Sequence, residues 1–164
     1  MRHNSSPYLL HAVIDNGVAL VTSAFNGRCN VMTASFFAES SHIPVLVRVA
    51  IAPSCLTHDL IVRRGWFGLS LLSEGQEELA LSCGSISGRE LSKFQSLGLR
   101  YQLSAHGVPL LPDCPTTSEC RVIEQTALAD HTLFTGEIVT SFRQSTISYR
   151  KTLLVSDLVD YLKA

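Results

Sequence analysis

Two segments of the sequence carry small hydroxyl side chains where they could contact a phosphorylated ligand. Residues 30–35 read Asn-Val-Met-Thr-Ala-Ser. On a strand, such side chains would let a flat ring lie close to the backbone, whose N–H groups could bond the polar edge of the ring. Ser54 and Thr57 lie at the predicted start of a helix, where free N–H groups form a ready anion site. The plainer interpretations are a strand that faces a neighbour, and a turn whose Thr57 only caps the helix.

A third segment combines a flexible loop with two cationic side chains. Ser87, Gly88 and Arg89 are followed by Lys93, one helical turn further along the chain. A guanidinium offers a planar set of donors and an ammonium offers a point charge, so the two bind phosphate in complementary ways. The plainer interpretation is a solvated loop with basic surface residues.

The sequence carries no signature of several common enzyme and metal-binding classes. It contains neither GxGxxG nor GxxxxGK(S/T), the two usual glycine-rich phosphate cradles, and no GxSxG nucleophile elbow. Its five cysteines are odd in number and show no CxxC or Cys-His spacing, which argues against a zinc site and a disulfide framework. We therefore expect no metal, and five reduced thiols as in a cytoplasmic protein.

The elements that must position these segments are mainly strands. Strands are predicted over residues 17–23, 29–36, 45–51, 66–72, 119–125 and 133–142. Short helices are predicted over residues 57–64, 74–83, 89–95 and 156–163. Asn26-Gly27 predicts a hairpin turn, and Ala129-Asp130-His131 predicts a second turn. Strands with short helices between them, without regular βαβ alternation, favour a mainly antiparallel barrel with helical additions.

Length and composition favour one domain over residues 1–164 and a second copy of the chain as its partner. The chain is 46% hydrophobic and 16% charged, with a net charge of −1. No basic cluster favours nucleic acid, and no apolar run is long enough to span a membrane. The N-terminus does not resemble a secretory signal. The surplus of apolar residues favours a homodimer, because such interfaces resemble a core cut in half.

The order of the motifs resembles the flavin reductase family. The segment 30–35 is followed by Pro53-Ser54-x-x-Thr57, an apolar strand that begins at Trp66, and the S-G-R-x-x-x-K-F motif of residues 87–94. Further matches are Glu-Cys-Arg-Val at 119–122 and Asp-His-Thr-Leu-Phe-Thr-Gly-Glu-Ile at 130–138. The motifs span about residues 13–139. Ala129 stands where the family usually has glycine, and the segment after Val139 does not follow the family pattern.

The resemblance implies a mainly β, FMN-binding split barrel of the Greek-key type, with a flavin near each interface of a homodimer. The residues that it assigns to the cofactor come from the three segments described above. They are Asn30, Met32, Thr33, Ala34, Ser35, Ser54, Thr57, Ser87, Gly88, Arg89 and Lys93. His131 is the candidate catalytic residue, because it matches a histidine that lies near the nicotinamide-binding face in some reductases. A turn histidine that bonds a backbone carbonyl is the alternative.

The implied function is an NAD(P)H:flavin oxidoreductase that transfers a hydride from NADH or NADPH to FMN, with FAD the less expected flavin. A reductase of this type would serve an oxygenase or another electron-transfer partner. One alternative is an FMN electron-transfer protein of the flavoredoxin type, which would share every binding residue. Another is a non-catalytic split-barrel dimer that binds a different ligand.

Overall fold

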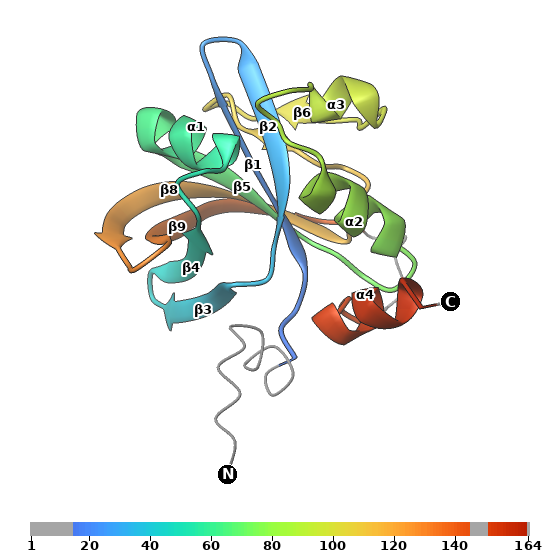
Figure 1. The fold of residues 1–164 in the computed structure, drawn as a ribbon. Coiled ribbons are helices and arrows are strands. Elements are labelled where there is room, and N and C mark those ends of the chain that lie inside the picture. Colours follow the sequence, from blue (N-terminus) through green and yellow to red (C-terminus); the bar gives the residue numbers. More distant parts are fainter. Residues whose placement is uncertain (1–14, 145–150, 164) are drawn as a thin grey trace.

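Seven strands form one antiparallel sheet in the computed structural model, which describes residues 15–144 and 151–163 (Figure 1). The strands are β1 (Ala19–Phe25), β2 (Arg28–Ala34), β3 (Phe37–His42), β4 (Val45–Ile51), β5 (Trp66–Leu71), β8 (Thr116–Ala127) and β9 (Thr132–Arg143). Their order across the sheet is β2-β1-β5-β8-β9-β4-β3, and every neighbouring pair is antiparallel. Two short strands, β6 (Gln102–Leu103) and β7 (Pro109–Leu110), pair separately. The expected mainly antiparallel β architecture is confirmed.

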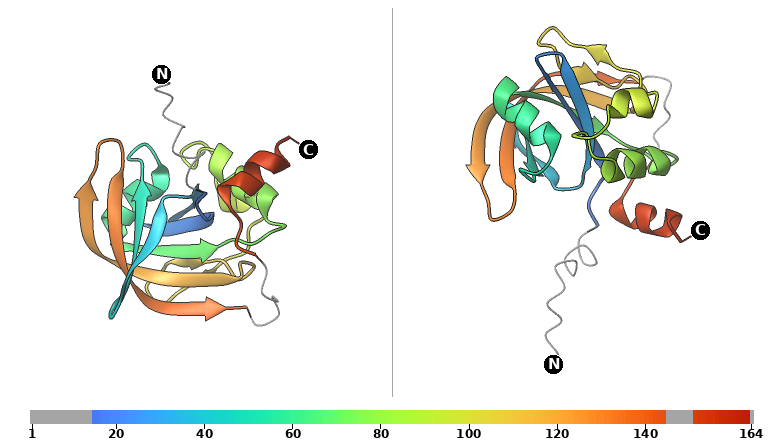
Figure 2. Two further views of the ribbon diagram at one scale, coloured as in Figure 1. Left: turned by 90° about the horizontal axis from the view of Figure 1, so that it is seen from below. Right: turned by 45° about the horizontal axis from the view of Figure 1, so that its top comes forward.

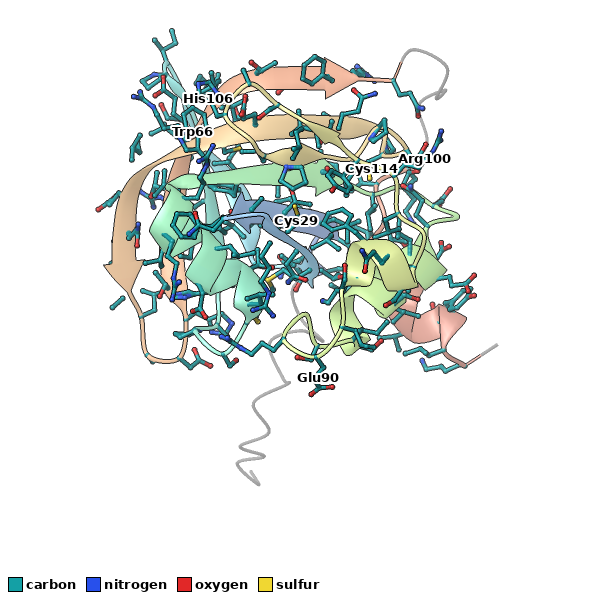
Figure 3. All side chains as sticks on the ribbon, turned by 90° about the horizontal axis from the view of Figure 1, so that it is seen from above. Cys29, Trp66, Glu90, Arg100, His106 and Cys114 are labelled. Carbon is teal, nitrogen blue, oxygen red and sulfur yellow. The ribbon has the colours of Figure 1, made fainter. Side chains whose placement is uncertain are left out.

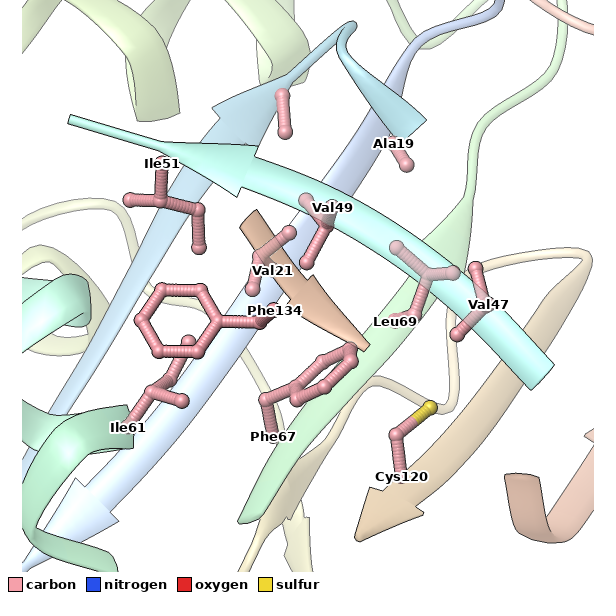
Figure 4. Close-up of a cluster of buried hydrophobic side chains, with 11 residues drawn as sticks. Ala19, Val21, Val47, Val49, Ile51, Ile61, Phe67, Leu69, Cys120 and Phe134 are labelled. Atoms are coloured by element: carbon pink, nitrogen blue, oxygen red, sulfur yellow. The ribbon is translucent and has the colours of Figure 1, made fainter. Parts of the chain in front are cut away.

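The sheet curls around a hydrophobic core, because strands far apart in its order share one cluster of buried side chains (Figure 4). Val21 of β1 and Val49 of β4 both belong to this cluster, although β5, β8 and β9 lie between those strands. Phe67 and Phe134 are its largest fully buried side chains. Gly136 lies against Phe67, where a Cβ atom would come within 2.6 Å of the ring. The edge strands β2 and β3 do not pair with each other in the sheet order, so the sheet is open.

Helices cover both faces of the β1–β2 hairpin. The helices are α1 (Leu56–Arg64), α2 (Glu77–Ser85), α3 (Lys93–Ser96) and α4 (Val155–Tyr161). Ile61 of α1 joins the core cluster on one face, while Ala80 of α2 and Phe94 of α3 join Leu20 and Val31 in a second cluster on the other face. Successive strand residues point to opposite faces, so β1 is buried on both. Figure 2 shows α2 and α4 at the opposite end of the molecule from the β8–β9 turn.

Several predicted elements agree with the structure and others need correction. The Asn26-Gly27 turn is confirmed, with φ of 48° and 77° at its two residues. The predicted strand 29–36 ends at Ala34, and the exposed, serine-rich β3 was not predicted. The predicted helix 89–95 is only the four-residue α3, because residues 88–90 form a turn and Ser92 before α3 has an extended backbone. Among the described residues, no helix is both long and apolar enough to cross a membrane.

Candidate functional site

A cavity of about 250 Å³ lies between β2, the start of α1 and the loop that follows α2. The three segments that carry hydroxyl and cationic side chains meet here, although they are far apart in the sequence. The predicted cofactor residues in its lining are Asn30, Met32, Thr33, Ser54, Ser87, Gly88 and Lys93. Cys55 and Ser85 also line it and were not predicted. Figure 1 shows how the fold brings β2, α1 and α2 around this position.

Lys93 places a buried positive charge at the cavity. The residue is only 3% exposed, and its Nζ atom donates a hydrogen bond to the Cys83 carbonyl oxygen at 2.5 Å. Within the described residues, no carboxylate lies at ion-pair distance from Lys93. Burial lowers the pKa of Lys93 below its usual value, although the thiols of Cys83 and Cys55 act in the opposite direction. A buried cation without an acidic partner is costly, so the cavity favours an anionic ligand.

Asn30 is the second buried polar side chain in this cavity. It is 2% exposed, and its Nδ2 atom donates to Thr57 Oγ1 at 2.9 Å. Its Oδ1 atom has no hydrogen-bond partner within the described part of the chain. Buried polar atoms are nearly always paired, so the free oxygen suits a ligand that donates a hydrogen bond.

Thr57 has a different position from the one predicted. Helix α1 begins at Leu56 with Cys55 as its N-cap residue, so the expectation that Thr57 caps the helix is wrong. Thr57 is fully buried in the first turn and does not line the cavity. Its hydroxyl group instead accepts the hydrogen bond from Asn30, which lies 27 positions earlier in the sequence. This tertiary contact outweighs the local preference of threonine for the N-cap position of a helix.

Arg89 ties the loop to the start of α1 and does not line the cavity. Its Nε atom donates to the Ser54 carbonyl oxygen at 2.9 Å, and its Nη2 atom donates to Asp59 Oδ2 at 2.9 Å. Partial burial acts to raise the pKa of Asp59, but the hydrogen bonds and charges of Arg89 and His58 lower it below its usual value. The guanidinium is therefore already paired at the edge of the cavity.

The last three predicted residues, at the end of β2 and just after it, lie in three different environments. Thr33 lines the cavity, but its hydroxyl group donates to the Ala80 carbonyl oxygen at 2.5 Å and so holds β2 against α2. Ala34 belongs to the hydrophobic core. Ser35 follows the end of β2 and is half-buried outside the lining.

His131 lies in the β8–β9 turn and is not part of the cavity lining. Its Nδ1 atom is 2.8 Å from Asp130 Oδ1, and its ring packs edge-on against Phe36 with centroids 5.6 Å apart. His58 was not predicted, yet its Nε2 atom bonds Thr132 Oγ1 at 2.9 Å beside this turn. Its Nδ1 atom lies 3.6 Å from Asp59, so a chain of polar contacts links the turn to Arg89.

A comparison with known protein families covers most of the chain. Residues 11–156 match the model of the family described as "Flavin reductase like domain". The chain belongs to this flavin reductase-like family. The match continues past Val139, which corrects the expectation that the following segment departs from the family pattern.

Relatives of the flavin reductase-like chain include named reductases. An uncharacterised protein of Archaeoglobus fulgidus is 36% identical over 67% of this chain, which spans 63% of that relative's length. A ferric-chelate reductase (NAD(P)H) from the same organism is 33% identical over 77% of this chain and 75% of its own length. The NADH-dependent flavin reductase StyB of Pseudomonas fluorescens is 30% identical, covering 77% of this chain and 71% of its own.

Solved structures of flavin-binding proteins share the fold. An FMN-binding protein from Thermus thermophilus matches with a TM-score of 0.83 and 28% identity, over 94% of this chain and 88% of its own. The NADH:FAD oxidoreductase SgcE6 of Streptomyces globisporus, in complex with NAD and FAD fragments, matches with a TM-score of 0.76 and 27% identity. That match covers 88% of this chain and 83% of the other.

Proposed function

We propose that the chain binds FMN in the cavity around Lys93 and acts as an NAD(P)H:flavin oxidoreductase. The observation that carries this proposal is a buried ammonium group that has no acidic partner among the described residues, in the cavity where the three predicted segments meet. A phosphate group beside Lys93 would neutralise that buried charge and accept charge-assisted hydrogen bonds. Membership of the flavin reductase-like family and the FMN-binding structural neighbour support the same ligand.

Different residues of the cavity would bind different parts of such a ligand. The hydroxyl groups of Ser54 and Ser87 would donate to the phosphate beside Lys93. Asn30 Oδ1 would accept a hydrogen bond from the ligand, with Thr57 keeping its amide in place. Backbone N–H groups around residues 33–35 would stabilise negative charge at the polar edge of the ring. A bound flavin would supply the ring that accepts a hydride from the nicotinamide.

His131 would contact the nicotinamide nucleotide rather than the phosphate of the flavin. Its position in the β8–β9 turn, outside the cavity, supports a role limited to the second substrate. NADH and NADPH are both candidate hydride donors, and the named relatives include an NADH-dependent and an NAD(P)H-dependent reductase.

A homodimer with a split-barrel arrangement is part of the proposal. Leu103 and Phe142 are 60% and 54% exposed and line a cavity of about 410 Å³ beside β8 and β9. A second copy of the chain would cover these apolar side chains. A reducing, cytoplasmic location suits the five free thiols, and an oxygenase would be the natural acceptor of reduced flavin.

An FMN electron-transfer protein is the second candidate function. No histidine, aspartate or glutamate side chain lines the described cavity, and His131 lies outside it. A protein that only exchanges electrons with protein partners needs no such group, and it would bind FMN with the same residues.

The visible spectrum of the purified protein under anaerobic conditions separates these functions. A flavin spectrum that bleaches within seconds of adding NADH or NADPH supports the reductase and identifies its donor. A flavin spectrum that persists with both donors contradicts the reductase and supports electron transfer between proteins. Protein that is colourless and takes up no FMN contradicts both and supports a non-catalytic split-barrel dimer. Sedimentation equilibrium tests the dimer independently.

A further inference from the structure

Cys55 places a thiol in the wall of the cavity that is proposed to hold the flavin phosphate. It is half-buried and lines this cavity together with Lys93 and Asn30. It precedes the nine-residue helix α1 as the N-cap residue, and its side chain makes no capping hydrogen bond. The thiol is therefore open to small molecules in the cavity.

Positive charge surrounds the Cys55 sulfur. Burial lowers the pKa of Lys93, while the thiols of Cys83 and Cys55 act in the opposite direction, so Cys55 lies within electrostatic reach of the ammonium. The N-terminus of α1 adds the positive end of a helix dipole. Asp59, the acidic residue in the first turn of this helix, is paired with Arg89 at 2.9 Å. These surroundings would stabilise an oxidised, negatively charged sulfur at this position.

The other four cysteines have less reactive surroundings. Burial raises the pKa of the Cys83 thiol to about 11 and the pKa values of Cys114 and Cys120 to about 12. Burial also raises the pKa of Cys29, which is half-buried on β2 outside this cavity. Figure 3 labels Cys29 and Cys114. Thiols with a raised pKa react slowly, and of the five cysteines only Cys55 lines the cavity.

A second group in the cavity suits an oxidised Cys55. Asn30 is 2% exposed, and its Oδ1 atom has no hydrogen-bond partner within the described residues. A sulfenic acid, Cys–SOH, has a hydroxyl group that donates a hydrogen bond, and its deprotonated form is an anion. The unpaired oxygen of Asn30 and the buried ammonium of Lys93 therefore match the two forms of the oxidised side chain.

We propose that Cys55 is an oxidation site whose sulfenic acid occupies the anion site of Lys93 and prevents FMN from binding. This inference rests on the proposed function, which puts the FMN phosphate beside Lys93. The oxidised sulfur and the phosphate would compete for the same cation, so a bound phosphate would in turn protect Cys55. Oxidation would thereby inactivate the flavin-free protein when peroxide accumulates.

Hydrogen peroxide is the oxidant that this step requires. The sulfur attacks one peroxide oxygen, so that an S–O bond forms and the O–O bond breaks. The leaving hydroxide takes up the thiol proton and departs as water, while the sulfur loses two electrons and the peroxide gains them. Reduced flavin that meets O2 yields oxidised flavin and hydrogen peroxide, so a reductase without its acceptor would produce this oxidant. Thiol reductants reverse the step.

The first part of the test locates the oxidised residue. Full-length protein, either flavin-free or loaded with FMN or riboflavin, is treated with hydrogen peroxide in the presence of dimedone, which traps sulfenic acids. Mass spectrometry then identifies the labelled cysteines. In flavin-free protein we expect Cys55 to be labelled at least about tenfold faster than Cys29. FMN is expected to slow the labelling of Cys55 more than riboflavin, which lacks the phosphate.

The second part measures flavin affinity by fluorescence quenching, before and after peroxide treatment without dimedone. Peroxide is expected to weaken FMN binding by wild type about tenfold, to affect riboflavin less, and to be reversed by dithiothreitol. Cys55→Ser is expected to lose this sensitivity to peroxide. Cys29→Ser is the matched control and should retain it, because Cys29 is half-buried like Cys55 but lies outside the cavity.

The outcomes separate this inference from the proposed function. Equal labelling of Cys55 and Cys29, or oxidation of Cys55 that leaves FMN affinity unchanged, would overturn the inference while the proposed function stands. Sensitivity of FMN binding to peroxide that persists in Cys55→Ser would overturn it as well. If untreated wild type binds no FMN, the proposed function itself fails, and this inference fails with it even where Cys55 is oxidised.

Discussion

The buried Lys93 ammonium donates its hydrogen bond to the backbone carbonyl oxygen of Cys83, 2.5 Å away, and to no acidic side chain within the described residues. The carbonyl group belongs to the last turn of α2, so the ammonium also completes the hydrogen bonding of that helix end. One neutral acceptor does not balance the charge of a buried cation. The fold therefore carries an electrostatic cost that an anionic ligand removes.

The electrostatic cost of burying the Lys93 ammonium predicts how the stability of the ligand-free protein changes with pH. Burial lowers the pKa of Lys93 in the folded state, so between that value and 10.5 the unfolded state binds more protons. The contribution of Lys93 to stability therefore rises with pH in this window.

We expect the free energy of unfolding of wild type, minus that of Lys93→Met, to increase from pH 7 toward pH 10. Urea unfolding at several pH values measures this difference, in which the titrations of groups that do not interact with Lys93 cancel. A difference that is constant or falls with pH would show that Lys93 is not desolvated.

Gly88→Ala is expected to destabilise the protein by about 1–3 kcal/mol, because its Cβ atom would overlap Asn30. Gly84→Ala is the matched control, since a Cβ atom there meets Thr33 at 3.5 Å, an ordinary contact, inside α2. A glycine inside a helix is less stable than alanine by ~0.5–1 kcal/mol, so the control should not lose stability. Thermal unfolding of Gly88→Ala, Gly84→Ala and wild type measures these differences in stability. Equal stability of Gly88→Ala and wild type would mean that the loop does not pack on Asn30.

Asp59→Asn is expected to tighten FMN binding about threefold, because Asp59 holds the Arg89 guanidinium at the edge of the cavity. The freed guanidinium would turn to the phosphate, and one negative charge near the ligand would be lost. The ion pair is partly exposed, with side chains 44% and 38% accessible, so we expect little change in stability. Isothermal titration with FMN measures the effect. Weaker binding in Asp59→Asn would instead make Asp59 a residue that positions Arg89 for the ligand.

His131→Gln is expected to raise the KM for the nicotinamide donor without changing the affinity for FMN, because the residue lies outside the cavity. His42→Gln serves as the control, since that histidine is 91% exposed on β3 and should leave both quantities unchanged. Steady-state kinetics and FMN titration of the two variants give the comparison. A loss of FMN affinity in His131→Gln would place the turn in contact with the flavin.

The sequence predicted correctly those strands and turns that are determined by the residues within them. Val45–Ile51 is a run of branched side chains and forms β4 with the predicted bounds, and Asn26-Gly27 forms the predicted hairpin turn. Strand β3 was missed because its residues are mostly exposed and polar, which leaves no alternating pattern. The four-residue β6–β7 pair is too short to carry such a pattern.

The candidate site was predictable as a set of residue types but not as a set of contacts. Three segments with phosphate-binding side chains could be found from spacing, and they do meet around one cavity. The pairing of Thr57 with Asn30, and of Arg89 with Asp59, joins residues about 30 positions apart. Such pairs depend on how the helix and the loop pack on β2, which neither propensity nor motif order encodes. His58 gave no signal, because a single histidine on a short helix fits no motif.

The affinity of the protein for FMN relative to riboflavin, in wild type and Lys93→Met, tests the central claim most directly. The two ligands share the ring and the ribityl chain and differ in the phosphate that Lys93 is proposed to bind. We expect wild type to prefer FMN by at least about tenfold, and Lys93→Met to lose most of this preference while it still binds riboflavin as wild type does. An FMN preference that survives in Lys93→Met would contradict a phosphate site at the buried ammonium.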